Sequence, residues 1–161
     1  MIVISGLPRS GNHILRALVL RCIRMKRRDP SWQGEKCTVW HGSEKAPTFD
    51  AGSTRFIIPV RDPHCRVASY KATGMPSGRF PEEACRRGVF RAVVALDAPV
   101  KLVSYEAFVA DPDGVGQELV AWLGYTWMAF PTDGRPGDPL NGPIFDGNAK
   151  YRNPFPLIKN Q

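Results

Sequence analysis

Short apolar runs alternate with amphipathic stretches along most of the sequence. The apolar runs are rich in Val, Ile and Leu and are bounded by Gly, Pro or polar residues, as buried strands usually are; they cover residues 2–5, 37–41, 55–60 and 100–105. The stretches between them predict helices over residues 11–28, between Asp62 and Gly74, over 81–96 and over 112–124. Strands that alternate with helices predict an α/β fold of three layers, a central parallel sheet with helices on both faces.

The composition is consistent with one such domain. A chain of 161 residues, 43% of them hydrophobic, is long enough to bury a single core, so we expect one domain over residues 1–161. From about Tyr125 onward the sequence is rich in Pro and Gly and has little periodicity. This composition predicts an irregular tail that covers the functional edge of the sheet.

Positive charge is concentrated in the first half of the chain. The net charge is +7, and residues 1–91 carry 17 Lys and Arg against 7 Asp and Glu, whereas residues 92–161 carry 5 against 8. This favours an anionic ligand in the first half, although the cluster from Arg24 to Arg28 is also explained by the preference of basic residues for a helix C-terminus. Basic and aromatic residues are not interleaved, and there is no zinc-finger spacing, so we expect no nucleic-acid partner.

Cysteine usage and the N-terminal residues narrow the class of protein. The cysteines are widely spaced without a C-x-x-C pair, which predicts neither a metal site nor a disulfide scaffold; they are Cys22, Cys37, Cys65 and Cys85. The apolar start "MIVIS" turns into a glycine loop after five residues. We therefore expect no secretory signal and no membrane anchor, and a cytoplasmic protein.

The segment "SGLPRSGNH" joins the first predicted strand to the first predicted helix. In open parallel sheets, such turns lie where helix N-termini present N–H groups to anions. Gly6 and Gly11 permit close approach of the backbone, Arg9 adds a permanent charge, and Ser10 adds a hydroxyl group. The loop lacks the Lys-Ser/Thr pair that ends a Walker A loop, so it predicts a phosphate site other than that of a nucleoside triphosphate.

The stretch "GLPRSGNHILRAL" resembles the 5'-phosphosulfate loop of sulfotransferases that use 3'-phosphoadenosine 5'-phosphosulfate (PAPS). In that family a Pro-Lys/Arg-Ser-Gly core is followed by two small polar residues, here replaced by Asn12 and His13. The resemblance implies that the loop binds the cofactor PAPS through Gly6, Pro8, Arg9, Ser10, Gly11, Asn12 and His13.

Two further family motifs follow in the family's order. The stretch "IIPVRDPHCRVASY" has Arg61 at a strand end and Ser69 eight positions later, similar to the pair that holds the 3'-phosphate. The stretch "VKLVSYEAFVADP" is similar to the family's strand followed by Tyr-Glu, with Tyr105 among the cofactor-binding residues. Three motifs over residues 3–112 imply a P-loop-like sulfotransferase fold that uses PAPS, releases adenosine 3',5'-bisphosphate and needs no metal.

The residues themselves allow two interpretations of the second motif. Arg61 at a strand end and Ser69 two turns along a helix would converge on a dianionic phosphate through charge-assisted hydrogen bonds. Alternatively, Arg61 forms an ion pair with Asp62 or Glu106, and Ser69 is an ordinary helix-surface residue.

Three histidines and one carboxylate compete as the general base. His41 ends the second predicted strand twenty residues before Arg61, a position similar to that of the family's catalytic His, and imidazole suits proton transfer near neutral pH. Some branches of the family use a carboxylate, so Glu44 is the alternative base. We expect His13 to contact phosphate or cap structure and His64 to face solvent.

The sequence departs from the family at several positions. Arg9 stands where many members have a Lys that reaches the bridging oxygen; we expect it to take part in catalysis by stabilising charge, since Arg is a poor proton donor. Ile14 replaces an aromatic residue that stacks on adenine, and "NAKYRNPF" only faintly matches the C-terminal phosphate element, with Lys150 and Arg152 as possible contacts. Only 35 residues separate Ser69 from Tyr105, where larger relatives bind the acceptor.

The resemblance implies transfer of a sulfuryl group from PAPS to a hydroxyl or amine acceptor, either a small molecule or a saccharide. One alternative is a non-catalytic module that binds PAPS or adenosine 3',5'-bisphosphate, which the short acceptor region favours. The other is a P-loop kinase-like phosphotransferase, which would need a Lys-Ser/Thr loop end and an acidic Mg²⁺ ligand. The oligomeric state does not follow from the sequence.

Overall fold

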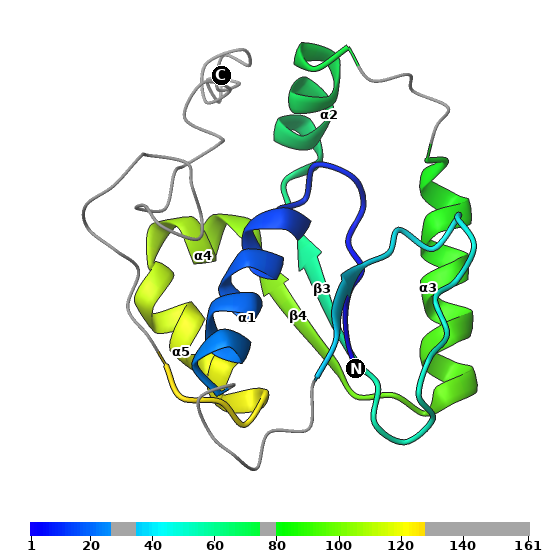
Figure 1. Ribbon diagram of the computed structural model, residues 1–161. Coiled ribbons are helices and arrows are strands. Elements are labelled where there is room, and N and C mark those ends of the chain that lie inside the picture. Colours follow the sequence, from blue (N-terminus) through cyan, green and yellow to red (C-terminus); the bar gives the residue numbers. More distant parts are fainter. Residues whose placement is uncertain (27–34, 75–79, 128–161) are drawn as a thin grey trace.

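The computed structural model describes residues 1–26, 35–74 and 80–127 (Figure 1). In order, the elements are β1 (Ile2–Ile4), α1 (Asn12–Lys26), β2 (Cys37–Val39), β3 (Arg55–Val60), α2 (Pro63–Ala72), α3 (Glu82–Leu96), β4 (Val100–Ser104), α4 (Tyr105–Ala110) and α5 (Pro112–Trp122). Within these residues the strands form a four-stranded sheet in the order β2-β1-β3-β4, and every neighbouring pair is parallel. The predicted α/β class and parallel sheet are confirmed.

The strand order determines where the loops that follow the strands come together. The chain leaves β1, forms β2 on one side of it, and then forms β3 on its other side. Ile4 at the end of β1 pairs with Val39 and Ile57, so the segments that follow β1, β2 and β3 emerge at the same edge. In open α/β sheets, the point where the strand order reverses is where ligands bind. Here that point is the loop after β1.

Helices cover both faces of the sheet (Figure 1). Because successive strand residues point to opposite faces, Ile2 and Ile4 pack with α1, α4 and α5, whereas Val3 packs on the side of α3. The larger core contains Ile2, Ile4, Leu15, Leu18, Val19, Cys22, Ile23, Ile57, Val103, Phe108, Leu119, Val120 and Leu123. The smaller core contains Met1, Val3, Trp40, Phe56 and Val89.

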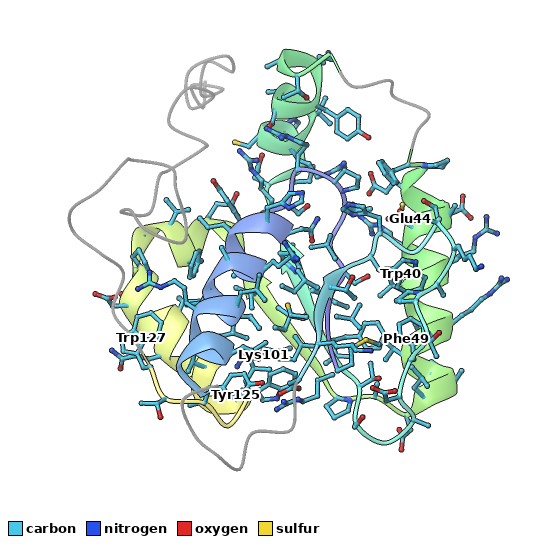
Figure 2. The ribbon with its side chains drawn as sticks, in the orientation of Figure 1. Trp40, Glu44, Phe49, Lys101, Tyr125 and Trp127 are labelled. Atoms are coloured by element: carbon cyan, nitrogen blue, oxygen red, sulfur yellow. The ribbon has the colours of Figure 1, made fainter. Side chains whose placement is uncertain are left out.

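Aromatic rings fill the smaller core. The ring centroids of Trp40 and Phe49 are 5.4 Å apart, and those of Phe49 and Phe56 are 5.8 Å apart. Figure 2 shows Trp40 and Phe49 on the α3 side of the sheet and Tyr125 and Trp127 on the other side. The three-layer arrangement expected from the sequence is therefore present, with unequal cores on the two faces.

Asp62 caps α2 as predicted, and the structure has one helix, α4, that the sequence did not predict. The Asp62 side chain accepts a hydrogen bond from the Cys65 backbone at 2.9 Å and caps α2. α4 was not expected, because the apolar run of β4 continues directly into it; Ser104 both ends the strand and caps the helix, its Oγ accepting from the Ala107 N–H at 3.2 Å. Tyr105, expected at a strand end, is thus the first residue of α4.

The bounds of other elements differ from the predicted ones by a few residues. β1 and β2 are shorter than expected, and α1 begins at Asn12 instead of residue 11. The four cysteines are free thiols. Among the described residues, no helix has the length and apolar character needed to cross a membrane. The predicted irregular tail lies outside the described residues from position 128 onward.

Candidate functional site

The loop between β1 and α1 is built from tightly constrained backbone. A Cβ at Gly6 would lie 2.5 Å from the Pro59 side chain, and a Cβ at Gly11, whose φ is +93°, would lie 2.6 Å from the Tyr105 ring. Arg9 also has a left-handed φ of +67°, a conformation that costs a non-glycine residue about 1–2 kcal/mol. Glycine would adopt this conformation without strain but has no side chain. An Arg at this position therefore accepts a strained backbone and provides a guanidinium group.

Asn12 holds the loop in shape. Its Oδ1 accepts a hydrogen bond from the Gly6 N–H at 2.8 Å, and its Nδ2 donates to the Gly6 and Leu7 carbonyl oxygens, both at 3.1 Å. The residue is 3% exposed. The sequence predicted Asn12 as a phosphate contact; its side chain is instead engaged with the loop backbone, which leaves the backbone N–H, in the first turn of α1, as the group suited to an anion.

Residues from four segments meet beside this loop. The Arg9 Nε–H donates to Ser69 Oγ at 2.9 Å, and Arg61 Nη1 donates to the Arg9 carbonyl oxygen at 2.8 Å. The Arg61 guanidinium carbon lies 4.5 Å from the centroid of the Tyr105 ring. Arg61 is only 8% exposed and Ser69 only 1%. The structure therefore brings Arg9, Arg61, Ser69 and Tyr105 together, although they lie up to 96 positions apart in the sequence.

These contacts decide between the two interpretations of Ser69. A helix-surface serine would be exposed, whereas Ser69 is buried and bonded to Arg9. Of the two carboxylates near Arg61 in sequence or motif, Asp62 caps α2, and Glu106 Oε1 accepts the Asp62 N–H at 3.0 Å; the ion-pair interpretation of Arg61 stays open. Two guanidinium groups and one hydroxyl at a helix N-terminus form an arrangement suited to a multiply charged anion.

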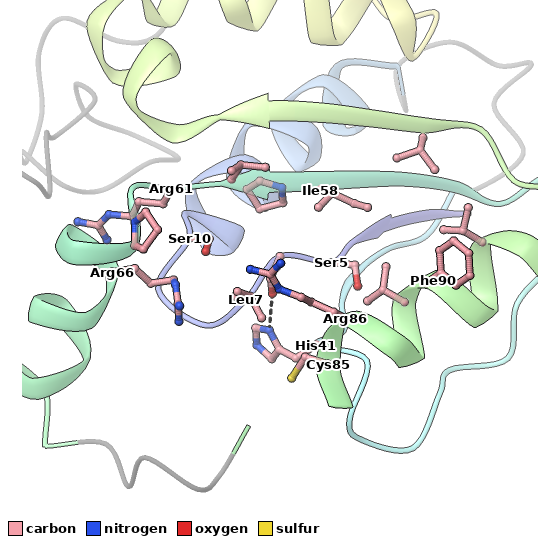
Figure 3. Close-up of a pocket in the computed structure, with 17 residues that line it drawn as sticks. Ser5, Leu7, Ser10, His41, Ile58, Arg61, Arg66, Cys85, Arg86 and Phe90 are labelled. Carbon is pink, nitrogen blue, oxygen red and sulfur yellow. Dashed lines mark hydrogen bonds between the residues drawn. The ribbon is translucent and has the colours of Figure 1, made fainter. Parts of the chain in front are cut away.

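His41 lies across the loop from this cluster. Its Nδ1 is 2.9 Å from the Gly6 carbonyl oxygen (Figure 3, dashed line). A carbonyl only accepts hydrogen bonds, so Nδ1 carries a proton, and in the tautomer with a single ring proton Nε2 is an acceptor. The ring centroid is 4.8 Å from that of Phe80. The tautomer with its proton on Nδ1 has the form that a general base needs, because its Nε2 can accept a proton.

The competing bases are arranged differently. Glu44 Oε1 accepts the His41 backbone N–H at 3.1 Å, and the Glu44 carbonyl accepts the Trp40 indole N–H at 3.2 Å, so Glu44 shapes the turn that carries His41. Partial burial, followed by electrostatic repulsion from His41, Arg16 and Arg9, lowers the pKa of His13. His64 is exposed, as predicted.

A close contact with α3 fixes the turn after β2. A Cβ at Gly42 would lie 2.2 Å from the Cys85 carbonyl oxygen, and a Cβ at Gly88 would lie 1.9 Å from the Gly42 carbonyl oxygen. Cys85 Sγ donates to Ser43 Oγ at 3.3 Å. Sequence reasoning missed this contact, because nothing in the sequence pairs one isolated glycine with another 46 positions later.

A cavity of about 500 Å³ adjoins the loop and His41 (Figure 3). Its lining comes from the loop, the end of β3, the start of β4, and helices α2 and α3. The lining residues are Ser5, Gly6, Leu7, Ser10, His41, Ile58, Pro59, Val60, Arg61, Pro63, Arg66, Cys85, Arg86, Val89, Phe90, Val93 and Val100. Its size is typical of a small-molecule site. His41 lines the cavity, whereas Glu44 is not part of the lining.

Two further predicted contacts lie in the loop, and two lie near the C-terminus. Pro8 is buried and Ser10 is 2% exposed within the loop. Lys150 and Arg152 lie outside the described residues. Within residues 1–26, 35–74 and 80–127, no three His, Cys, Asp or Glu side chains gather as a metal site would require.

No protein-family model matches the chain, and no curated protein matches it in sequence.

Proposed function

We propose that the chain is a sulfotransferase with a P-loop-like sulfotransferase fold, which moves a sulfuryl group from PAPS to a hydroxyl or amine acceptor. The observation that carries the proposal is the convergence of Arg9, Arg61 and Ser69 at the loop after β1. The resemblance to the family's motifs implied this group of residues, and their contact across the fold supports assigning them to one ligand.

PAPS carries two anionic groups that match two parts of the site. The loop backbone, the N-terminus of α1 and Arg9 are suited to the 5'-phosphosulfate. Arg61 and Ser69 are suited to the 3'-phosphate, since a guanidinium and a hydroxyl both donate hydrogen bonds to phosphate oxygens. The close approach of Gly6 and Gly11 to their neighbours keeps the loop free of side chains that would block its N–H groups.

The chemistry requires an acceptor freed of its proton and a stabilised leaving group, as in phosphoryl transfer. His41 is the proposed base, because its Nδ1–H is engaged by the Gly6 carbonyl and its Nε2 is an acceptor. Negative charge develops on the 5'-phosphate of the departing adenosine 3',5'-bisphosphate. Arg9 stabilises that charge without donating its proton, because guanidinium does not deprotonate in proteins.

A non-catalytic module that binds PAPS or its desulfated product is the second candidate. The strain at Arg9 and the burial of Ser69 concern anion binding and apply to both candidates. What favours catalysis is the separate placement of His41 on the cavity that adjoins the loop.

Two measurements on the same protein test the proposal. Calorimetry with adenosine 3',5'-bisphosphate is expected to show stoichiometric binding without added metal, with adenosine 5'-triphosphate and Mg²⁺ as the control for a kinase-like site. Incubation with ³⁵S-labelled PAPS and a panel of alcohols, phenols, amines and saccharides is expected to label at least one acceptor. Binding without transfer to any acceptor would favour the non-catalytic module, and preference for the triphosphate would rule out the proposed ligand.

A further inference from the structure

The cavity continues from His41 over a part of the sheet that α3 leaves open. Ile58 and Val60 of β3 point to the same face as Phe56, which packs against the α3 side. Beyond them on this face lies Leu102, the partner of Ile58 in β4. Val60 is 51% exposed and Leu102 is 65% exposed, so the β3–β4 half of this face is apolar and uncovered among the described residues.

The opposite wall of the cavity is also apolar. It comes from one side of α3, which presents Val89, Phe90 and Val93 to the cavity. Phe90 is 70% exposed, and Figure 3 shows it on α3, away from the loop and His41. One end of the cavity is therefore the polar loop and the other end is an apolar slot between a helix and a sheet.

Three polar side chains of the cavity, Ser5, Arg66 and Arg86, are engaged with other residues. Ser5 Oγ donates to the Trp40 carbonyl oxygen at 2.5 Å. Arg66 and Arg86 both bind the Glu82 carboxylate, with nitrogen–oxygen distances of 2.6 Å and 2.5 Å, which links α2 to α3 at the rim. The apolar slot offers few hydrogen-bonding partners to a polyhydroxylated ligand, whose buried hydroxyl groups would lose their hydrogen bonds to water.

We infer that the acceptor of the proposed sulfotransferase is a small apolar alcohol or phenol, held with its hydrocarbon part between Phe90, Val93 and Val60 and its hydroxyl beside His41. This inference rests on the proposed function and narrows its acceptor class, excluding saccharides. The cavity volume of about 500 Å³ accommodates one or two rings. An apolar wall adjoining a base is the arrangement that binds an acceptor by its hydrocarbon part and leaves its oxygen to react.

The reaction at this place is balanced by the groups already named. The acceptor O–H gives its proton to Nε2 of His41, and the acceptor oxygen forms a bond to the sulfur of PAPS. The bond between that sulfur and the bridging oxygen breaks, and its electron pair remains on the 5'-phosphate of adenosine 3',5'-bisphosphate. No oxidant, reductant or metal is needed for this step.

The experiment compares acceptors after binding of the bisphosphate product has been measured. With ³⁵S-labelled PAPS, 4-nitrophenol and 2-naphthol are expected to be sulfated, and glucosamine and glucose are expected to remain unlabelled at equal concentration. If the bisphosphate binds but the saccharides are labelled and the phenols are not, the inference is wrong while the proposed function stands. If the bisphosphate binds and no acceptor is labelled, the inference is also overturned. If the bisphosphate does not bind, the proposed function fails and the inference fails with it.

Matched variants locate the acceptor. Phe90→Gln replaces an exposed apolar residue that lines the cavity, and Val94→Gln replaces one on the same helix, 61% exposed, that does not line it. Phe90→Gln is expected to raise the KM for 2-naphthol roughly three- to tenfold, because part of a Phe side chain loses its apolar contact, whereas Val94→Gln leaves it unchanged. Val60→Thr, nearly equal in shape, is expected to raise the same KM. Equal changes of the KM for 2-naphthol in Phe90→Gln and Val94→Gln would overturn the place assigned to the acceptor.

Discussion

At the scale of single residues, Arg9 and Arg61 are held at the same corner of the molecule by a backbone carbonyl and a serine hydroxyl. Arg61 donates to the Arg9 carbonyl oxygen, and Arg9 donates to Ser69. Two nearby positive charges repel each other, and burial increases that repulsion. The proposed anion would offset this repulsion when it binds.

Replacing Arg61 tests the assigned phosphate. Arg61→Ala is expected to weaken PAPS and adenosine 3',5'-bisphosphate alike, since the proposed 3'-phosphate contact occurs in both. A charged hydrogen bond contributes about 1.5–3 kcal/mol, which corresponds to a loss of affinity of about 10- to 150-fold. Adenosine 5'-phosphosulfate lacks the 3'-phosphate and should lose much less. Calorimetry on the three ligands decides the matter, and equal losses for all three would exclude the role given to Arg61.

Replacing His41 separates binding from transfer. His41→Ala is expected to leave PAPS affinity nearly unchanged and to slow transfer by about 10²- to 10⁴-fold, the usual contribution of a general base. Glu44→Gln is the matched comparison, because it removes the carboxylate that accepts the His41 N–H with little change of shape. Single-turnover rates with bound PAPS measure the transfer step in both variants. If Glu44→Gln stops transfer while His41→Ala does not, the carboxylate is the base.

The resemblance to the sulfotransferase motifs identified these residues but could not give all their roles. The interval between Arg61 and Ser69 predicted that they act together, and the structure places both against Arg9. The role of the Asn12 side chain could not be predicted, because an amide binds backbone groups, solvent or phosphate equally well, and only the folded loop shows that Gly6 and Leu7 are its partners.

At the scale of elements, the ends of strands were harder to predict than the strands themselves. β3 was predicted from its apolar run. α2 was predicted because Asp62 and Pro63 are local start signals that act within one turn. α4 was missed because Ser104 ends a strand and caps a helix at the same position, so no polar break separates them. The contact between Gly42 and α3 is non-local and leaves no periodic trace in the sequence.

That contact gives a prediction about α3. Gly88→Ala would raise intrinsic helix stability by about 1 kcal/mol, so any loss must come from the Cβ, which would lie 1.9 Å from the Gly42 carbonyl oxygen. We expect urea unfolding to show a net loss of about 1–3 kcal/mol, and transfer to slow as the His41 turn is displaced. Ala95→Gly, at an exposed position of α3, is the control. It should lower stability by a similar amount without changing the transfer rate per folded molecule; an unaffected or stabilised Gly88→Ala protein would contradict the prediction.

At the scale of the whole molecule, Glu35 links segments at the edge of the sheet opposite the loop. Its carboxylate binds Arg55 at the start of β3, with a nitrogen–oxygen distance of 2.8 Å, and accepts a hydrogen bond from the Tyr125 hydroxyl beyond α5. Burial alone would raise the pKa of Glu35, but the hydrogen bonds from Tyr125 and Arg55 and nearby positive charges outweigh it, so the pKa is lowered.

The sign of this pKa change predicts a pH-dependent variant. A carboxylate with a lowered pKa in the folded state stabilises the protein above its unfolded pKa of about 4.3, and this stabilisation is lost as the pH falls through the folded value. Glu35→Gln is therefore expected to lower the free energy of unfolding at pH 7 by about 1–2 kcal/mol, and the difference from wild type should shrink below about pH 4. Urea unfolding at both pH values measures this. A difference that persists unchanged in acid would mean that packing, not charge, is responsible.

The layout of the whole molecule explains what else the sequence could not reveal. Strand residues such as Val60 and Leu102 have the same apolar character as those in a covered core. Whether a helix lies over them depends on where α3 crosses the sheet, which the periodicity of α3 does not specify. The class and the strand positions followed from local signals, and the cluster of Arg9, Arg61 and Ser69 from the motif resemblance, whereas the open half of the sheet followed from neither.

The unequal cores on the two faces imply unequal resistance to local unfolding. Among the described residues, α1 contributes five members to the larger core and α5 contributes two, whereas α3 contributes Val89 alone to the buried part of the smaller one. Regions with few buried contacts open at lower free energy than the rest of the fold. Amide hydrogens of α3 are therefore expected to exchange with deuterium sooner than those of α1 and α5, as mass spectrometry of peptic fragments can measure. Because Gly42 packs against this helix, the amides of the His41 turn should lose protection together with α3, so the same rare opening would expose the cavity and displace His41.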